Sequence, residues 1–143
     1  MIGKSDQQER YRIKYKNAEN IIFSGYVPDT QFYEMLRNAD VLCMCRTNSG
    51  FSNAGFPFKL GEYLATGNTV ISTRASDVCN YLTDDDAYMV EFESPESIST
   101  ALTTIITNPE EARRVGLNGY RKYMEFFSPE SNGKLLHELL MSL

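Results

Sequence analysis

Two continuous apolar runs, separated by a segment with the signals of a helix, constrain the fold of this chain most strongly. The first run covers residues 40–45, and the second, Thr69–Thr73, is rich in β-branched residues. Runs of this length without polar alternation are typical of strands buried on both faces, as in parallel sheets covered by helices. Between them, Pro57 suits the first turn of a helix and Gly67 suits its end. We therefore expect an α/β fold with a Rossmann-like parallel sheet flanked by helices.

Shorter patterns predict the remaining elements. Three similar starts, at Ser94, Asn108 and Ser128, each place a capping side chain before a proline and an acid, and each predicts a helix. Asn108 also has Glu111 three residues further on, which is a variant of the capping box. Apolar runs predict two more strands, at residues 21–24 and 87–92. A charged segment at residues 5–17 and an apolar stripe at residues 29–36 predict two more helices.

Composition sets the class of protein. A chain of 143 residues with 42% hydrophobic and 23% charged residues is typical of one globular domain, which we expect to span residues 1–143. The net charge of −5 argues against nucleic acid as a partner. No apolar run approaches the about 20 residues of a membrane span, and the N-terminus lacks the pattern of a signal peptide. The three cysteines favour a reducing cytoplasm, and without a Cys-x-x-Cys spacing or a histidine partner we expect no metal site.

The loop between the first buried strand and the following helix carries the candidate site. In open parallel sheets the ligand binds beyond the carboxyl ends of the strands, which here means residues 46–59 and 73–74. A loop with Gly50 and Gly55 that enters a helix can hold an anion, because free N–H groups and the helix dipole face the ligand. Lys59 in the first turn would reach a bound phosphate. Alternatively, its ammonium extends to water or pairs with Glu62.

Several motifs in this region resemble the donor-binding domain of retaining GT-B glycosyltransferases of the group 1 type. Phe56-Pro-Phe-Lys-Leu-Gly-Glu-Tyr-Leu-Ala-Thr-Gly is similar to the donor-binding helix, especially in the subgroup that reads Phe-Pro-Ser-Lys-Leu. Asn20-Ile-Ile-Phe-Ser-Gly-Tyr-Val-Pro, Leu36-Arg-Asn-Ala-Asp-Val-Leu and Phe127-Ser-Pro-Glu resemble other segments of the family, in the same order. The resemblance covers nearly the whole chain and implies the C-terminal domain of such an enzyme.

The resemblance implies a role for each matching residue. Glu62 would accept hydrogen bonds from the donor's ribose hydroxyls, and Lys59 would neutralise phosphate charge. The loop of Gly55, Phe56, Pro57 and Phe58 would bring backbone N–H groups to the donor sugar and diphosphate. Val27 would meet the nucleobase through its backbone. A surface acid at Glu62 and a plain core valine at Val27 are the competing interpretations. No catalytic nucleophile is identified, and His137 is interpreted as structural.

Two departures from the family pattern bear on function. The first acid of the family's pair would fall at position 54, where this chain has Ala54, with Asn53 as a candidate substitute. Two further strands, a basic Arg/Lys pair and a complete acceptor domain would precede this chain, which starts near the tail of the second strand. We therefore expect an N-terminally truncated domain that is inactive on its own. We also expect residues 40–45 to be exposed along one sheet edge.

The resemblance thus implies a metal-independent, retaining hexosyltransferase-type enzyme that needs no cofactor beyond its nucleotide-sugar donor. Its expected partners are the nucleotide-sugar and the missing acceptor domain, and its expected process is polysaccharide or glycolipid biosynthesis. Peripheral membrane association of the full enzyme is compatible with that role. The alternative is a non-catalytic nucleotide- or phosphate-binding α/β module, which Ala54 favours. A flavodoxin-like receiver domain is disfavoured, because Asp40 opens its strand rather than closing it.

Overall fold

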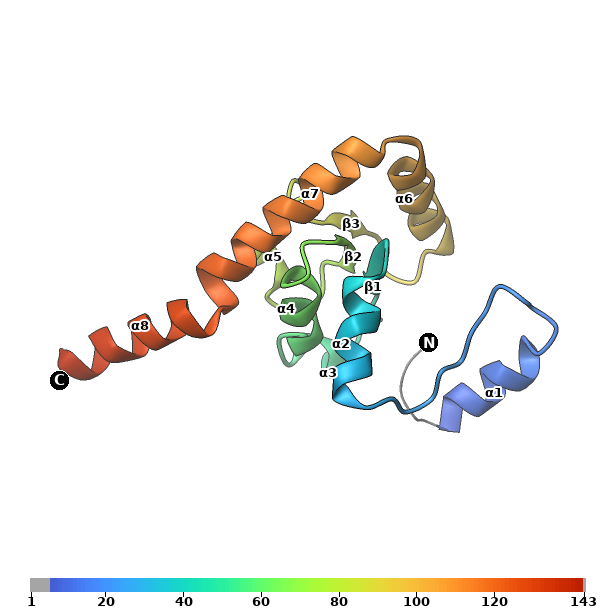
Figure 1. Cartoon of the computed structure of the whole chain (residues 1–143), viewed down its shortest axis with the longest axis horizontal. Coiled ribbons are helices and arrows are strands. Elements are labelled where there is room, and N and C mark those ends of the chain that lie inside the picture. The colour runs from blue at the N-terminus through green and yellow to red at the C-terminus, as the bar shows by residue number, and fades with distance from the viewer. Residues whose placement is uncertain (1–5, 143) are drawn as a thin grey trace. The chain divides into compact units, whose positions relative to one another are not determined.

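The chain divides into two compact units, Met1–Asn38 and Ala39–Leu143, which we describe separately. The computed structural model describes residues 6–142. The first unit contains two helices, α1 (Asp6–Lys14) and α2 (Asp29–Arg37) (Figure 1). Both predicted helices are confirmed, and α1 ends earlier than expected. Residue 5 and the chain start near residues 2–3 lie outside the described residues. That the whole chain forms one domain stays a prediction.

The predicted strand at residues 21–24 is wrong. These residues are irregular, and the only bridge near them in the described chain is at Gly25. The amide of Ile21 donates to the carbonyl of Ala18 at 3.1 Å, in a turn rather than a ladder. The side chain of Ile22 is 72% exposed. An apolar run predicts that a segment prefers burial, but a strand also needs a neighbour for its backbone hydrogen bonds.

The second unit is built on a parallel sheet of three strands. Its strands are β1 (Val41–Met44), β2 (Thr69–Thr73) and β3 (Tyr88–Val90), in that order across the sheet. Both pairings are parallel, with Leu42 opposite Val70 and Ser72 opposite Met89. The predicted strands at residues 40–45, Thr69–Thr73 and 87–92 are therefore confirmed, with β1 at an edge of this sheet. Its elements are β1 (Val41–Met44), α3 (Gly50–Asn53), α4 (Phe58–Leu64), β2 (Thr69–Thr73), α5 (Val78–Tyr81), β3 (Tyr88–Val90), α6 (Pro95–Thr107), α7 (Pro109–Lys122), the π-helical turn η1 (Tyr123–Phe127) and α8 (Pro129–Met141).

The core lies on both faces of the sheet. All five residues of β2 are buried, and since alternate side chains point to opposite faces, helices must cover both. On one face, side chains of β2, β3, α6 and α7 form a cluster of Ile71, Val90, Ala101, Ile105 and Ala112. Helix α4 packs against β1 and β2 and buries Leu60 and Leu64. The burial of β2 fixes the position of the loops that leave its end.

Two of the three predicted helix caps are confirmed. The hydroxyl oxygens of Ser94 and Ser128 accept hydrogen bonds from the amides of the third residues that follow them. Asn108 is the N-cap residue of α7 as predicted, but its side chain makes no capping hydrogen bond, because its side-chain amide donates backward to the Thr104 carbonyl at 3.1 Å. The predicted capping box also fails. Glu111 instead forms an ion pair with Arg114 at 2.7 Å.

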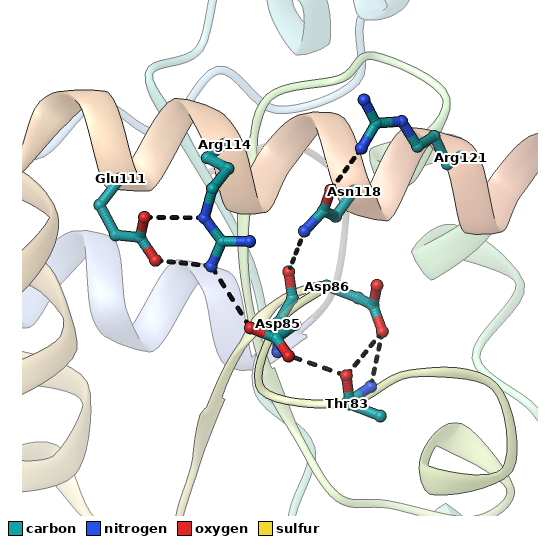
Figure 2. Close-up of polar contacts among 7 residues, drawn as sticks. All are labelled: Thr83, Asp85, Asp86, Glu111, Arg114, Asn118 and Arg121. Carbon is teal, nitrogen blue, oxygen red and sulfur yellow. Dashed lines mark hydrogen bonds and ion pairs between the residues drawn. The ribbon is translucent and has the colours of Figure 1, made fainter.

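The acidic turn before β3 holds helix α7 in place (Figure 2). The carboxylate of Asp85 accepts from Arg114 at 3.3 Å, and its carbonyl accepts from the side-chain amide of Asn118 at 3.0 Å. The buried carboxylate of Asp86 accepts from both the amide and the hydroxyl of Thr83. Because Asp85 and Asp86 both accept hydrogen bonds from neighbouring residues of the chain, we assign them a structural role. Within residues 6–142, no helix is both long and apolar enough to cross a membrane.

Candidate functional site

Arg46 holds the loop at the carboxyl ends of strands β1 and β2. Its backbone amide donates to the hydroxyl of Thr73, the last residue of β2, at 3.0 Å. Its guanidinium donates to the carbonyl of Gly55 at 2.8 Å. The long loop after β1 is therefore tied both to the neighbouring strand and back onto itself. Open parallel sheets bind their ligands at these carboxyl ends of the strands.

The middle of the same loop is held by short polar contacts. Ser49 caps the single turn α3, because its hydroxyl oxygen accepts from the amide of Ser52 at 3.1 Å. The side-chain carbonyl of Asn53 accepts from the amide of Ser76 at 3.2 Å, and its NH₂ group donates to Asn48 at 2.9 Å. Asn53 thus joins this loop to the one that follows β2. Ala54, which stands where the resemblance expects an acid, is exposed.

The start of α4 brings six of the predicted site residues together. Gly55, Phe56 and Pro57 lead into the helix, Pro57 is buried at its N-cap, and Phe58, Lys59 and Glu62 are exposed on its first two turns. The first amides of a helix have no acceptor within the helix. This sequence therefore presents unpaired N–H groups, a cation and a carboxylate over a short stretch of chain. Val27 is half-buried in the first unit, and its contact with a nucleobase stays a prediction.

The structure narrows the alternatives for Lys59. Among the ion pairs formed by residues 6–142, none joins Lys59 to Glu62. The proposed i, i+3 pair is therefore not formed. A cation in the first turn of a helix is disfavoured by the helix dipole. Within residues 6–142, Lys59 is thus an exposed cation without an ion-pair partner, either extended to water or available to an anion.

Sequence reasoning missed the contacts that support this loop. Arg46 stands directly after an apolar run, and its position at the strand end was the only available signal. The ring of Phe56 packs against Tyr81 and Phe127, which lie far along the chain. No local pattern could reveal those ring contacts. The backbone of Phe56, rather than its ring, therefore remains available to a ligand.

Three titratable side chains belong to the elements that flank the site: Tyr63 on α4, Cys43 on β1 and Cys45 directly after β1. Burial, and then the neighbouring Glu62 carboxylate, raise the pKa of Tyr63. Partial burial raises the pKa of the Cys43 thiol, and burial followed by Cys43 does the same for Cys45. These groups therefore stay protonated at neutral pH. Lys59 and Glu62 are the charged side chains that α4 presents at its start.

Solved structures with the same fold place this architecture in a class. The crystal structure of Alr3699/HepE from Anabaena in complex with UDP matches with a TM-score of 0.82 and 13% identity, covering 99% of this chain and 40% of that one. The C-terminal domain of the group 1 family glycosyltransferase LpcC from Francisella tularensis matches with a TM-score of 0.71 and 22% identity, covering 87% of this chain and 64% of that one. The fold is that of part of the C-terminal domain of GT-B glycosyltransferases.

Sequence comparison gives the family itself. The family model described as "Glycosyl transferases group 1" matches residues 1–122, and the chain belongs to this family. An MMP α-(1→4)-mannosyltransferase from Mycolicibacterium hassiacum is 27% identical over 110 residues, which cover 76% of this chain and 26% of the relative. The chain thus spans about a quarter of this relative and two fifths of the Anabaena protein.

Proposed function

We propose that this chain binds the nucleotide-sugar donor of a retaining, metal-independent hexosyltransferase in polysaccharide or glycolipid biosynthesis. One observation carries the proposal. Lys59 and Glu62 are exposed on the first two turns of α4, after a loop that Arg46 fixes to the carboxyl edge of the sheet. The related Anabaena protein has been solved in complex with UDP and with UDP-glucose. The three cysteines are free thiols, which suits a reducing cytoplasm.

The residues divide the donor between them. The amides of Phe58 and Lys59, with the Lys59 ammonium, bind the diphosphate at the positive end of α4. The Glu62 carboxylate accepts hydrogen bonds from adjacent ribose hydroxyls. As the bond between the anomeric carbon and the diphosphate oxygen breaks and the glycosidic bond to the acceptor forms, negative charge grows on the leaving diphosphate. Hydrogen-bond donors that are already in place stabilise that charge. No residue of this chain is assigned as nucleophile, and the acceptor is bound by a separate domain of the complete enzyme.

Ala54 supports a second candidate function. The resemblance expects a carboxylate there to contact the donor sugar, and a methyl group cannot make that contact. A non-catalytic nucleotide-binding module would keep the diphosphate and ribose contacts and lose the sugar contact. The two functions differ in the complete protein, which transfers sugar in the first case and only binds nucleotide in the second.

Calorimetric titration with UDP, GDP and ADP tests the proposed function. We expect weak binding of at least one nucleotide and no sugar transfer by the 143-residue chain alone. Lys59→Ala is expected to weaken this binding by about 1–3 kcal/mol, the scale of a charge-assisted hydrogen bond. It should not lower the free energy of unfolding, because a cation is removed from a helix N-terminus.

The matched control is Lys134→Ala, which removes another exposed lysine, on α8, far along the chain from the loop. It should leave nucleotide affinity unchanged. Equal affinity in the wild type and the Lys59→Ala variant would show that the Lys59 ammonium extends to water and does not bind the diphosphate. Glycoside formation by the purified chain would contradict the expected inactivity.

A further inference from the structure

Four aromatic rings form a cluster beside the loop that leads into α4. Phe56 stacks on Phe127 with ring centroids 5.1 Å apart and an interplanar angle of 25°. Tyr81, the last residue of α5, forms a T-shaped pair with Phe56 and a tilted pair with Phe127, with ring centroids 5.5 Å and 5.2 Å apart, respectively. Phe126 touches Tyr81 at 5.4 Å. This aromatic cluster joins α5, η1 and the loop that leads into α4, which are remote in sequence.

Phe56 is one of few anchors of the loop. In the segment 54–59, only Phe56 and Pro57 are withdrawn from solvent, and the other four residues are exposed. On its N-terminal side the segment is held by the bond from Arg46 to the Gly55 carbonyl. On its C-terminal side Pro57 enters α4. The ring of Phe56 therefore determines how the intervening backbone is oriented.

Phe127 is held firmly on its own side. It ends the π-helical turn η1, in which the amide of Ser128 donates to the carbonyl of Tyr123 at 2.9 Å. Ser128 is 1% exposed, and its hydroxyl donates to the Met124 carbonyl at 3.0 Å. One extra residue in a turn rotates the following side chains by about 100° relative to a regular α-helix. The direction of the Phe127 ring therefore depends on η1.

Phe127 also lies beside helix α4 itself. A Cβ atom placed at Gly61 of α4 would lie 3.8 Å from the Cβ of Phe127. Gly61 directly precedes Glu62, the proposed ribose contact. Phe127 thus contacts Phe56, two residues before α4, and also lies beside Gly61 in the first turn of that helix.

We infer that Phe127 is a positioning residue of the donor site, which holds the loop before α4 in its binding conformation through Phe56. The inference rests on the proposed function and extends it to a residue more than sixty positions beyond the donor helix. Without this ring the loop would sample other conformations, and the nucleotide would bind only the fraction that is correctly ordered. The expected loss of affinity is about threefold to tenfold, the range of an aromatic pair contact.

The chain offers a matched control in the adjacent residue. Phe127→Leu and Phe126→Leu remove the same group from the same turn, and both residues touch Tyr81. Of these two residues, only Phe127 contacts Phe56, and the rings of Phe126 and Phe127 also lie 6.3 Å apart. We would measure hydrogen–deuterium exchange of the amides in residues 53–60 without ligand, and the affinity for UDP, GDP and ADP by calorimetry. Phe56→Leu, alone and combined with each substitution, completes two double-mutant cycles.

The inference makes a distinct prediction for each measurement. Phe127→Leu should speed exchange in residues 53–60 and weaken nucleotide binding, whereas Phe126→Leu should do neither. Phe127→Leu and Phe56→Leu should be non-additive, because they remove the same contact, while Phe126→Leu and Phe56→Leu should be additive.

Several outcomes would overturn the inference. Equal exchange in the two leucine variants would do so even if no nucleotide binds. Faster exchange in Phe127→Leu with unchanged affinity would overturn the positioning role alone. A wild-type chain that binds none of the three nucleotides would instead refute the proposed function, and the exchange data would still decide whether Phe127 holds the loop.

Discussion

Gly116, in the middle of α7, is a position where a single methyl group should cost stability. A Cβ atom added there would lie 2.6 Å from the carbonyl oxygen of Gly67, 2.9 Å from the carbonyl carbon of Asn68 and 3.0 Å from the amide nitrogen of Thr69. All three are backbone atoms, two just before β2 and one at its first residue, so no side chain can move aside. Gly116→Ala therefore pushes α7 away from the sheet.

The magnitude follows from two opposing effects. Replacing glycine by alanine inside a helix normally stabilises a protein by about 0.5–1 kcal/mol. Overpacking of a close contact costs about 1–3 kcal/mol, and contacts this short with backbone place the cost at the upper end. We expect Gly116→Ala to lower the free energy of unfolding by about 2 kcal/mol. With a urea m-value of about 1–3 kcal/mol/M, the midpoint of unfolding should fall by about 1 M.

Gly133→Ala in α8 is the control, since a Cβ atom there would have nothing within 4 Å. It should raise the free energy of unfolding by about 0.5–1 kcal/mol, the ordinary helix effect. Urea unfolding followed by far-UV circular dichroism measures both. A Gly116→Ala chain that is as stable as the wild type would refute the packing of α7 on the start of β2.

Three further predictions concern the loop, the acid stability and the sheet edge. Arg46→Met removes the donor to the Gly55 carbonyl and should weaken nucleotide affinity about tenfold; unchanged affinity by calorimetry would contradict this. The hydrogen bond from Arg114 lowers the pKa of Glu111 in the folded chain. The stability that this ion pair contributes is therefore complete above a pH of about 4.3, the pKa of an unperturbed Glu, and is lost as the pH falls through the lowered pKa. The urea midpoints of the wild type and Glu111→Gln should therefore converge at acid pH, and a constant difference would count against the pair. Strand β1 forms an edge of the sheet, so we expect concentration-dependent association in sedimentation velocity, reduced by Cys43→Lys; a monomer at all concentrations would refute it.

The sheet was predictable because its strands carry their own signal. Residues 40–45 and Thr69–Thr73 lack a regular alternation of polar and apolar residues, which is the pattern of strands with both faces covered. Strand β2 is buried at every position, whereas in β1 only Leu42 is buried, so the expectation of full burial holds for β2 and is wrong for β1. Residues 21–24 have a similar pattern and form no strand. The difference lies in the pairing partner, which a local pattern does not contain.

The polar and aromatic contacts of the site were predictable only in part. The position of Lys59 and Glu62 at the start of α4 follows from the proline and the apolar spacing around them. The cap at Asn108 failed because the carbonyl of Thr104 competes for the same side chain. The contact between Phe56 and Phe127 joins residues more than seventy positions apart, and only the fold brings them together.

The most direct test of the central claim is a crystal structure of the protein with a bound nucleoside diphosphate. We expect the diphosphate oxygens within hydrogen-bonding distance of the amides of Phe58 and Lys59 and of the Lys59 ammonium. The ribose hydroxyls should donate to the carboxylate of Glu62. A nucleotide bound away from the carboxyl edge of β1 and β2, or one bound at this edge with Glu62 turned to solvent, would contradict the donor site proposed for this chain.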